Sequence, residues 1–154
     1  AALERKRRVQ LPKDYRAFLL QVGNGGAGPG YGLAPLAVLL GGRRPPLHKS
    51  FPYSTELAVE LMRARAATDK DDRFLPEAAY QGMVELCDLG CSTSACLVLT
   101  GEQAGTIWFT GEFGWYPEFE IVAGEARQHS FVSWYEAWLA DALAVFASSC
   151  SGPR

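Results

Sequence analysis

The sequence predicts an α+β fold: one domain with an antiparallel sheet of about four to six strands, packed by N-terminal and C-terminal helices. Three observations indicate this class. Apolar residues recur at helical spacing near both ends of the chain, apolar and polar residues alternate in its middle, and 154 residues correspond to one domain. Hydrophobic residues form 48% of the chain, which is enough for a substantial core. We expect the domain to span residues 1–154, with frayed ends over 1–10 and 147–154.

The N-terminal half is predicted to hold two helices, and a weak helical pattern precedes them within residues 2–9. The first spans Pro12 to Val22, with proline at its tolerated first position and Gly23 as a left-handed residue that ends it. The second spans Thr55 to Ala67 behind Ser54, whose hydroxyl is suited to cap the first turn. Residues 68–81 are polar, and we expect them to be irregular.

From residue 82 onward the pattern changes to strands and a closing helix. Strands are predicted at residues 83–87, 94–100, 106–109 and 118–122, with a glycine-bounded hairpin turn at Gly101–Gly105. The closing helix runs from about Phe131 to Phe146 behind Ser130 as N-cap. Its apolar residues form one stripe, which we expect to cover one face of the sheet. The stripe consists of Phe131, Trp134, Tyr135, Trp138, Leu139, Ala142, Leu143 and Phe146.

A glycine-rich run follows the first helix and allows two interpretations. Gly23, Gly25 and Gly28 have the spacing of a dinucleotide-binding fingerprint. That fingerprint requires a preceding strand and a following helix, whereas here a helical pattern precedes the run and Gly-Pro-Gly follows. No acidic residue lies between Asp14 and Glu56 to bind a ribose. The pattern therefore argues against nucleotide binding and predicts a sharp turn.

The glycine-rich run is also part of an ordered set of motifs. The set begins with Leu-Pro-x-Asp-Tyr-Arg-x-Phe-Leu at residue 11, passes through the glycine-rich run, continues with Gly82–Cys91 and Leu97–Gly101, and ends with Ser130–Leu139. In this order and at this spacing, the chain resembles the SUKH superfamily. The resemblance implies a bacterial immunity protein that neutralises a toxin, with a fungal cell-wall regulator as a distant relative. It also implies structural roles for Gly23, Asn24, Gly25, Gly28, Pro29, Tyr31, Gly32, Gly90, Cys91, Trp108, Trp134 and Trp138.

Charge is distributed unevenly along the chain, although its formal net charge is only −2. Residues 82–141 contain Arg127 as their single lysine or arginine, beside nine acidic residues. An acidic surface of this kind attracts basic partners and repels nucleic acid. The alternative is that these carboxylates only solubilise an apolar half of the molecule. The basic cluster Arg5–Arg8 is interpreted as a solvated helical face.

The cysteines favour a structural role in a reducing compartment. Cys87, Cys91, Cys96 and Cys150 lack the repeated spacing of a zinc site, and neither histidine lies close to them in sequence. Cys87 and Cys96 fall within apolar strand patterns, where free cysteine behaves as a small hydrophobe. No apolar run is long enough to cross a membrane, and no secretory signal pattern is present. We therefore expect a cytoplasmic protein with no metal and no cofactor.

The sequence offers no constellation of catalytic residues. It contains no nucleophile elbow, no phosphate-binding loop and no zinc-protease helix. His129 precedes Ser130, but adjacent side chains rarely face each other, and Ser130 is expected to cap a helix. We therefore predict that the protein has no catalytic residues and is not an enzyme. The alternative is a thiol or hydrolase activity at Cys91 or His129.

The segment from Gly111 to Glu118 is the candidate for partner binding. It places three aromatic side chains in a loop punctuated by glycine and proline, and exposed aromatic residues often anchor interfaces. The alternative is that Phe113 and Trp115 fill one end of the core. The predicted partner-binding residues are Glu112, Phe113, Trp115, Tyr116, Glu118, Glu120 and Glu125.

Together with the resemblance, these features predict an immunity protein that binds a cognate protein toxin in a bacterial polymorphic or contact-dependent toxin system. A nuclease is the natural target, because carboxylates mimic the phosphate charge that a basic substrate channel attracts. The alternative function is a non-catalytic regulatory scaffold or peptide-binding module, as the fungal relative suggests. Neither nucleic acid nor a membrane is an expected partner, and the sequence leaves the oligomeric state open.

Overall fold

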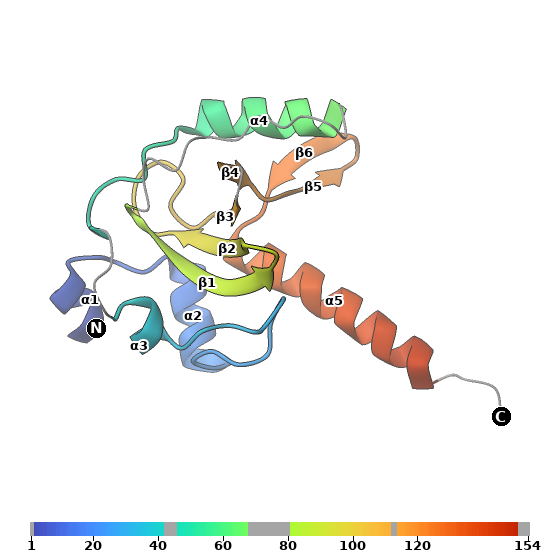
Figure 1. The fold of residues 1–154 in the computed structure, drawn as a ribbon, viewed down its shortest axis with the longest axis horizontal. Coiled ribbons are helices and arrows are strands. Elements are labelled where there is room, and N and C mark those ends of the chain that lie inside the picture. The colour runs from blue at the N-terminus through green and yellow to red at the C-terminus, as the bar shows by residue number, and fades with distance from the viewer. Residues whose placement is uncertain (1, 42–45, 68–80, 112–113, 151–154) are drawn as a thin grey trace.

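The computed structural model describes residues 2–41, 46–67, 81–111 and 114–150 (Figure 1). The elements in these ranges are α1 Ala2–Arg7, α2 Lys13–Gln21, α3 Leu36–Leu39, α4 Thr55–Ala67, β1 Met83–Gly90, β2 Thr93–Val98, β3 Ile107–Gly111, β4 Gly114–Pro117, β5 Phe119–Val122, β6 Glu125–Gln128 and α5 Phe131–Cys150. They form a single α+β domain, which confirms the predicted fold class. The irregular segment predicted at 68–81 lies almost wholly outside the described residues.

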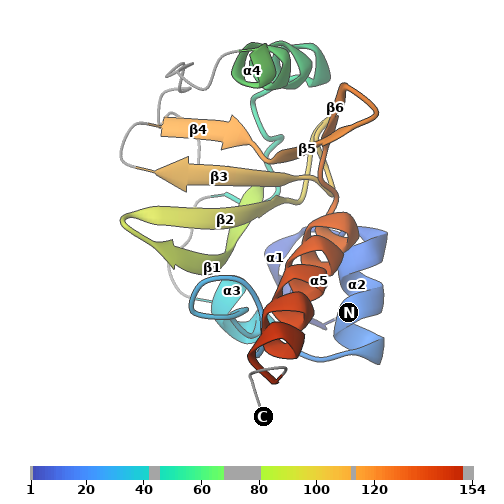
Figure 2. The same cartoon turned by 90° about the vertical axis from the view of Figure 1, so that its right-hand side faces the viewer.

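Four strands form the main sheet in the order β1-β2-β3-β4, and each neighbouring pair is antiparallel (Figure 2). The predicted hairpin is confirmed, since β2 and β3 flank Gly101–Gly105 and place Cys96 opposite Trp108. β5 and β6 form a separate antiparallel hairpin, of which the sequence predicted only the first strand. The chain turns between them at Ala123 and Gly124, whose positive φ values suit a two-residue hairpin turn.

Helices cover both faces of the main sheet, with α4 on one side and α2 and α5 on the other (Figure 1). The side chains of β2 and the residue after it show the division. Ala95, Leu97 and Leu99 join one apolar cluster, whereas Cys96 and Val98 join a second cluster on the opposite face. Because both sets are buried, this strand has a continuous apolar sequence instead of an alternating one.

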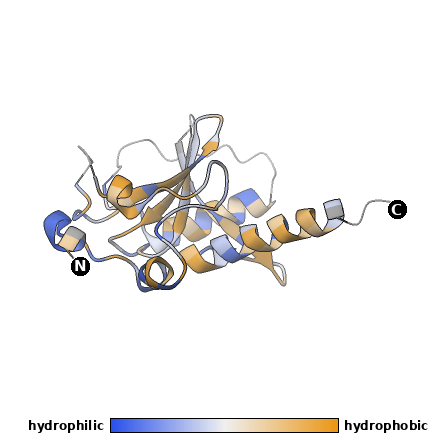
Figure 3. Cartoon of the chain, turned by 90° about the horizontal axis from the view of Figure 1, so that it is seen from below, coloured by the Kyte–Doolittle hydropathy of each residue, from blue (hydrophilic) through white to orange (hydrophobic). Residues whose placement is uncertain are grey.

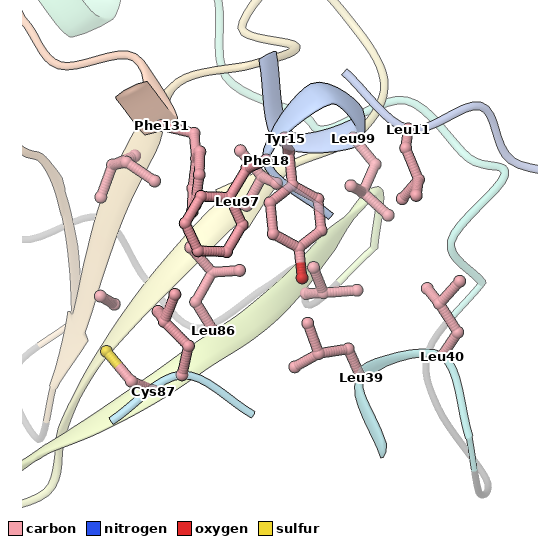
Figure 4. Packing of buried hydrophobic residues seen from close by; sticks show 14 of the residues in the cluster. Leu11, Tyr15, Phe18, Leu39, Leu40, Leu86, Cys87, Leu97, Leu99 and Phe131 are labelled. Atoms are coloured by element: carbon pink, nitrogen blue, oxygen red, sulfur yellow. The ribbon is translucent and has the colours of Figure 1, made fainter. Parts of the chain in front are cut away.

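Aromatic rings lie at the centre of both clusters. In the larger cluster, between the sheet and α2, α3 and α5, the Phe131 ring packs edge-on against Tyr15 and Phe18, with centroids 4.8 and 5.0 Å apart (Figure 4). In the smaller cluster, beneath α4, the Phe51 ring lies 5.0 Å from Trp108. Residues from distant parts of the sequence therefore hold the helices onto the sheet.

The predicted helix caps are confirmed. α4 begins at Thr55, and the Ser54 hydroxyl accepts a hydrogen bond from the Leu57 backbone N–H at 3.3 Å. At the start of α5, Ser130 Oγ accepts from the Ser133 N–H at 3.2 Å, and Ser133 Oγ accepts from the Ser130 N–H at 3.0 Å. These reciprocal bonds act as a capping box that fixes how the chain enters α5.

The glycine-rich run joins the end of α2 to the edge of the sheet. The backbone N–H groups of Tyr31 and Ala34 donate to the β1 carbonyls of Asp88 and Leu86, at 3.0 and 2.9 Å respectively. Gly25 has a φ of 89°, and a Cβ at this position would lie 2.8 Å from a backbone oxygen. This tight turn therefore requires glycine.

Several residues that match the family motifs occupy distinct structural positions. The Asn24 side-chain oxygen accepts a hydrogen bond from the Leu36 N–H at 2.8 Å, at the start of α3. Trp108 and Trp134 are buried in the two clusters. Tyr31, by contrast, is 83% exposed, so its side chain lies outside the core.

One prediction about the N-terminal region is wrong. Gly23 was expected to take the left-handed conformation, but it has no positive φ. The first glycine of the run with a positive φ is Gly25. α1 lies within the segment 2–9, where the sequence has a weak helical pattern. The Glu4 carboxylate, which is buried, accepts a hydrogen bond from the Leu11 N–H at 3.1 Å and ties α1 to the core.

α5 is longer than predicted, and its second half is uncovered. It runs to Cys150 instead of ending near Phe146. Phe131 and Trp134 are buried as predicted, whereas Leu143 is 59% and Phe146 68% exposed. The helix extends beyond the edge of the sheet (Figure 1). The prediction that the whole apolar stripe covers the sheet is therefore wrong.

The prediction for the two strand cysteines is confirmed. Cys87 and Cys96 are free thiols buried in the two clusters. Burial raises the pKa of the Cys87 thiol to about 11, so this thiol stays protonated at neutral pH. Cys91 is also a free thiol but is exposed, in the turn between β1 and β2.

Candidate partner-binding surface

The segment predicted to form an aromatic loop is largely a strand. β4 pairs with β3, and Trp115 lies opposite Thr110 in this pairing. Trp115 is only 1% exposed, and its ring stacks 6.1 Å from Phe51 beneath α4. The expectation that Trp115 is an exposed anchor is therefore wrong, and the alternative that it fills the core is confirmed. Glu112 and Phe113 lie outside the described residues.

Tyr116 is partly buried, and a charged neighbour from α4 approaches it. The Arg65 guanidinium carbon lies 4.2 Å from the centroid of the Tyr116 ring, which is the geometry of a cation–π contact. The ring also packs edge-on against Phe109, with centroids 5.6 Å apart. Burial raises the pKa of the Tyr116 hydroxyl. Tyr116 thus offers only part of its ring to a partner.

Glu118 lies between the main sheet and the β5–β6 hairpin. Its N–H donates to the Ile107 carbonyl at 3.0 Å, and its carbonyl accepts from the His129 N–H at 2.9 Å. Burial raises the pKa of its carboxyl to about 7, although Arg65 and the Phe119 N–H favour the charged form. Glu118 was predicted as a partner-binding carboxylate, but burial leaves its carboxyl partly neutral at physiological pH.

The exposed members of the predicted site lie on the β5–β6 hairpin. Glu120 and Glu125 are exposed on β5 and β6, and Glu120 lies opposite Arg127 across the strands. Ile121, which the sequence analysis missed, is 54% exposed beside Glu120. The signal that could have indicated this hairpin is the Ala-Gly pair at 123–124 between two short strand-like segments. The structure therefore places the two carboxylates on one face of the hairpin, together with Arg127, and Ile121 on its other face.

The other carboxylates of the acidic half lie in different places. Glu85 and Asp88 are exposed on β1, which is one edge strand of the main sheet. The β5–β6 hairpin follows β4, the opposite edge strand (Figure 2). Glu102 accepts a hydrogen bond from the Thr55 N–H at 3.1 Å, at the start of α4. The acidic residues thus form at least two separate surfaces, and the β5–β6 hairpin carries one of them.

His129 and Ser133 form a contact that resembles part of a catalytic site. The His129 Nδ1 atom lies 3.1 Å from Ser133 Oγ. However, His129 is only 6% exposed, and the Ser133 hydroxyl already takes part in the capping box of α5. Burial lowers the pKa of His129, while the nearby charge of Glu120 opposes this shift. The arrangement is suited to holding the helix start in place.

The chain belongs to the SMI1 / KNR4 family (SUKH-1), whose family model matches residues 1–148. This match confirms the resemblance found in the sequence motifs. Comparison with curated proteins and comparison with solved structures each found no match. Within the described ranges, no three histidine, cysteine or acidic side chains gather as metal ligands. No helix in those ranges combines the length and apolar character that spanning a bilayer requires.

Proposed function

We propose that this protein is an immunity protein that binds a cognate protein toxin, from a bacterial polymorphic or contact-dependent system, and blocks its activity. Membership of the SUKH-1 family supports this proposal, because the family resemblance implies toxin neutralisation. The observation that carries it is the β5–β6 hairpin, where Glu120, Ile121 and Glu125 are exposed on one two-stranded element. Glu120 and Glu125 share one face of this hairpin and Ile121 lies on the other, so a partner that closes around the hairpin contacts both faces.

Each group on the hairpin has a distinct role in this proposal. Ile121 supplies apolar contact area, whereas Glu120 and Glu125 attract a basic surface and raise the association rate. A basic substrate channel, such as that of a nuclease, is the surface that these carboxylates fit. Glu112 and Phe113 remain predicted contacts. Trp115 contributes indirectly, because its burial holds β4 in place ahead of the hairpin.

Co-expression with the toxin encoded next to this protein tests the function. The expected result is that the protein restores growth to cells making the toxin and co-purifies with the toxin at a defined ratio. A toxin that kills in its presence and forms no complex would refute the function. A stable complex with a non-toxic neighbour, without rescue, would favour the regulatory scaffold instead.

Charge reversal on the hairpin tests the binding surface separately from the function. The double substitution Glu120→Lys with Glu125→Lys is expected to slow association with the toxin by about 10-fold or more at low salt. Glu85→Lys with Asp141→Lys is the matched control, because it makes the same change in net charge at exposed positions on β1, at the opposite edge of the sheet, and on α5. Equal slowing by both pairs, or slowing by the control alone, would show that the hairpin is not the recognition surface.

A further inference from the structure

The second half of α5 is an apolar helix that no described part of the chain covers. Leu139, Leu143 and Phe146 are 40, 59 and 68% exposed. Apolar residues continue along this projecting half of the helix in Figure 3. Soluble monomers rarely leave such a continuous apolar surface open, so it indicates an interaction site.

A groove continues this surface toward the body of the molecule. It has a volume of about 400 Å³ and lies between α2 and α5. Its apolar lining includes Phe18 and Val22 from α2 and Val132, Tyr135 and Leu139 from α5. Leu139 belongs both to the groove and to the exposed stripe. One half of the surface is therefore hollow, and the other half projects.

The spacing along α5 indicates that another helix fills the groove. Val132, Leu139 and Phe146 are each seven residues apart, and Tyr135 and Ala142 occupy the fourth position of each interval. Apolar residues at the first and fourth positions of a seven-residue repeat form the seam of paired helices. The body of this molecule supplies no helix to the projecting part of that seam among its described residues.

The charges of α5 favour a second copy of the same helix over a charged partner. The helix contains no Lys or Arg, and Glu136 and Asp141 are its two acidic residues. A surface so poor in charge is suited to another apolar surface rather than to a charged partner. In an antiparallel pairing centred on Leu139, Glu136 faces Ala142 of the second copy, and neither carboxylate faces a like charge.

We propose that α5 pairs in antiparallel orientation with α5 of a second copy, about a two-fold axis at Leu139. The projecting Leu143 and Phe146 of each copy then lie against Tyr135 and Val132 of the other, in the groove between α2 and α5. Each copy places the projecting half of its α5 in the groove of the other copy. Both contacts are therefore made within two copies, which form a closed dimer. The pairing uses α5 and α2, not the β5–β6 hairpin, and stands independently of toxin binding.

The available area sets the strength of this dimer. A helix of 20 residues is about 30 Å long and about 10 Å wide, so pairing along its length buries on the order of 1,000 Å² in total. This is the lower end of the range for specific interfaces. The dimer is therefore expected to dissociate on dilution.

Sedimentation equilibrium over about 1 to 200 µM protein tests the proposal. The wild type is expected to change from monomer to dimer in this range. Phe146→Glu and Leu139→Glu should each weaken the dimer by about 100-fold or more, because each buries a charge at the first position of the repeat in the seam. Both residues are exposed in the monomer, so circular dichroism and the melting temperature, measured at about 1 µM where the protein is monomeric, should stay unchanged. Ala144→Glu is the matched control, since it adds the same charge on the side of α5 opposite the seam.

A monomeric wild type throughout this range overturns the proposal, and so does a dimer that Phe146→Glu leaves intact. Cysteine cross-linking tests the orientation in a Cys91→Ser, Cys150→Ser background. Leu139→Cys should form a disulfide with its own copy, because the axis brings these two positions together. Phe146→Cys should not cross-link to itself, and a Phe146→Cys disulfide dimer would show parallel pairing and refute the two-fold arrangement.

Discussion

Glu118→Gln is predicted to stabilise the protein above neutral pH and to have little effect in mild acid. Burial raises the pKa of the Glu118 carboxyl from 4.5 to about 7, against the opposing effects of Arg65 and the Phe119 N–H. Between these two pH values the carboxyl is ionised in the unfolded chain but protonated in the folded protein. Unfolding therefore releases a proton within this window, and the free energy of unfolding falls as the pH rises through it.

The size of the effect follows from the shift in pKa. Below about pH 4.5 the Glu118 carboxyl is protonated in both the folded and the unfolded protein, and above about pH 7 it is ionised in both. The free energy of unfolding therefore falls no further above about pH 7. A shift of about 2.5 units corresponds to about 3 kcal/mol of unfolding free energy. Glutamine has nearly the same shape and stays neutral. Glu118→Gln should therefore exceed the wild type by up to about 3 kcal/mol at about pH 8.

His129 contributes with the opposite sign and must be separated from Glu118. Burial lowers the pKa of His129 below 6.5, with Glu120 opposing, so the folded protein loses stability relative to the unfolded chain as the pH falls below 6.5. Both the wild type and the Glu118→Gln variant contain His129. The difference between their unfolding free energies at each pH therefore isolates Glu118.

Urea unfolding at several values between about pH 4.5 and about pH 8 measures this difference. Glu125→Gln is the matched control, because it makes the same chemical change at an exposed position of the same hairpin. A difference between Glu118→Gln and wild type that stays constant with pH would refute the inference that burial controls the Glu118 carboxyl. A gain of equal size in Glu125→Gln would assign the effect to net charge instead.

Three further substitutions or treatments test the packing. Trp115→Ala should lower the unfolding free energy by about 3–5 kcal/mol in urea titrations, whereas Tyr31→Ala at an exposed aromatic residue should change it by less than about 0.5 kcal/mol. Ser130→Ala should cost about 1 kcal/mol in the same assay, because it removes one bond of the capping box at α5. In the native protein, mass spectrometry should find Cys91 alkylated at neutral pH and the buried Cys87 unmodified until urea unfolds the chain.

Local sequence was sufficient where local interactions decide the structure. The bounds of α4 were predicted correctly, because Ser54 caps the helix through a bond to a residue three positions away. The hairpin of β2 and β3 was also correct, since the glycines at 101 and 105 mark a turn between two apolar strands. The order of the family motifs identified the superfamily for the same reason, as each motif is a short segment of sequence.

Tertiary structure decided which apolar and charged side chains face solvent. Glycine and proline around Trp115 suggested a loop, but the free edge of β3 pairs with this segment and turns the ring inward. The pKa of Glu118 likewise depends on its burial and on the charge of Arg65, which belongs to a helix distant in sequence.

For α5, periodicity correctly identified one apolar face, yet only the three-dimensional arrangement shows that the helix extends beyond the sheet and leaves Phe146 uncovered. A repeat along the chain specifies which side of a helix is apolar. How far the sheet extends beneath that side of the helix is set by strands that lie elsewhere in the sequence.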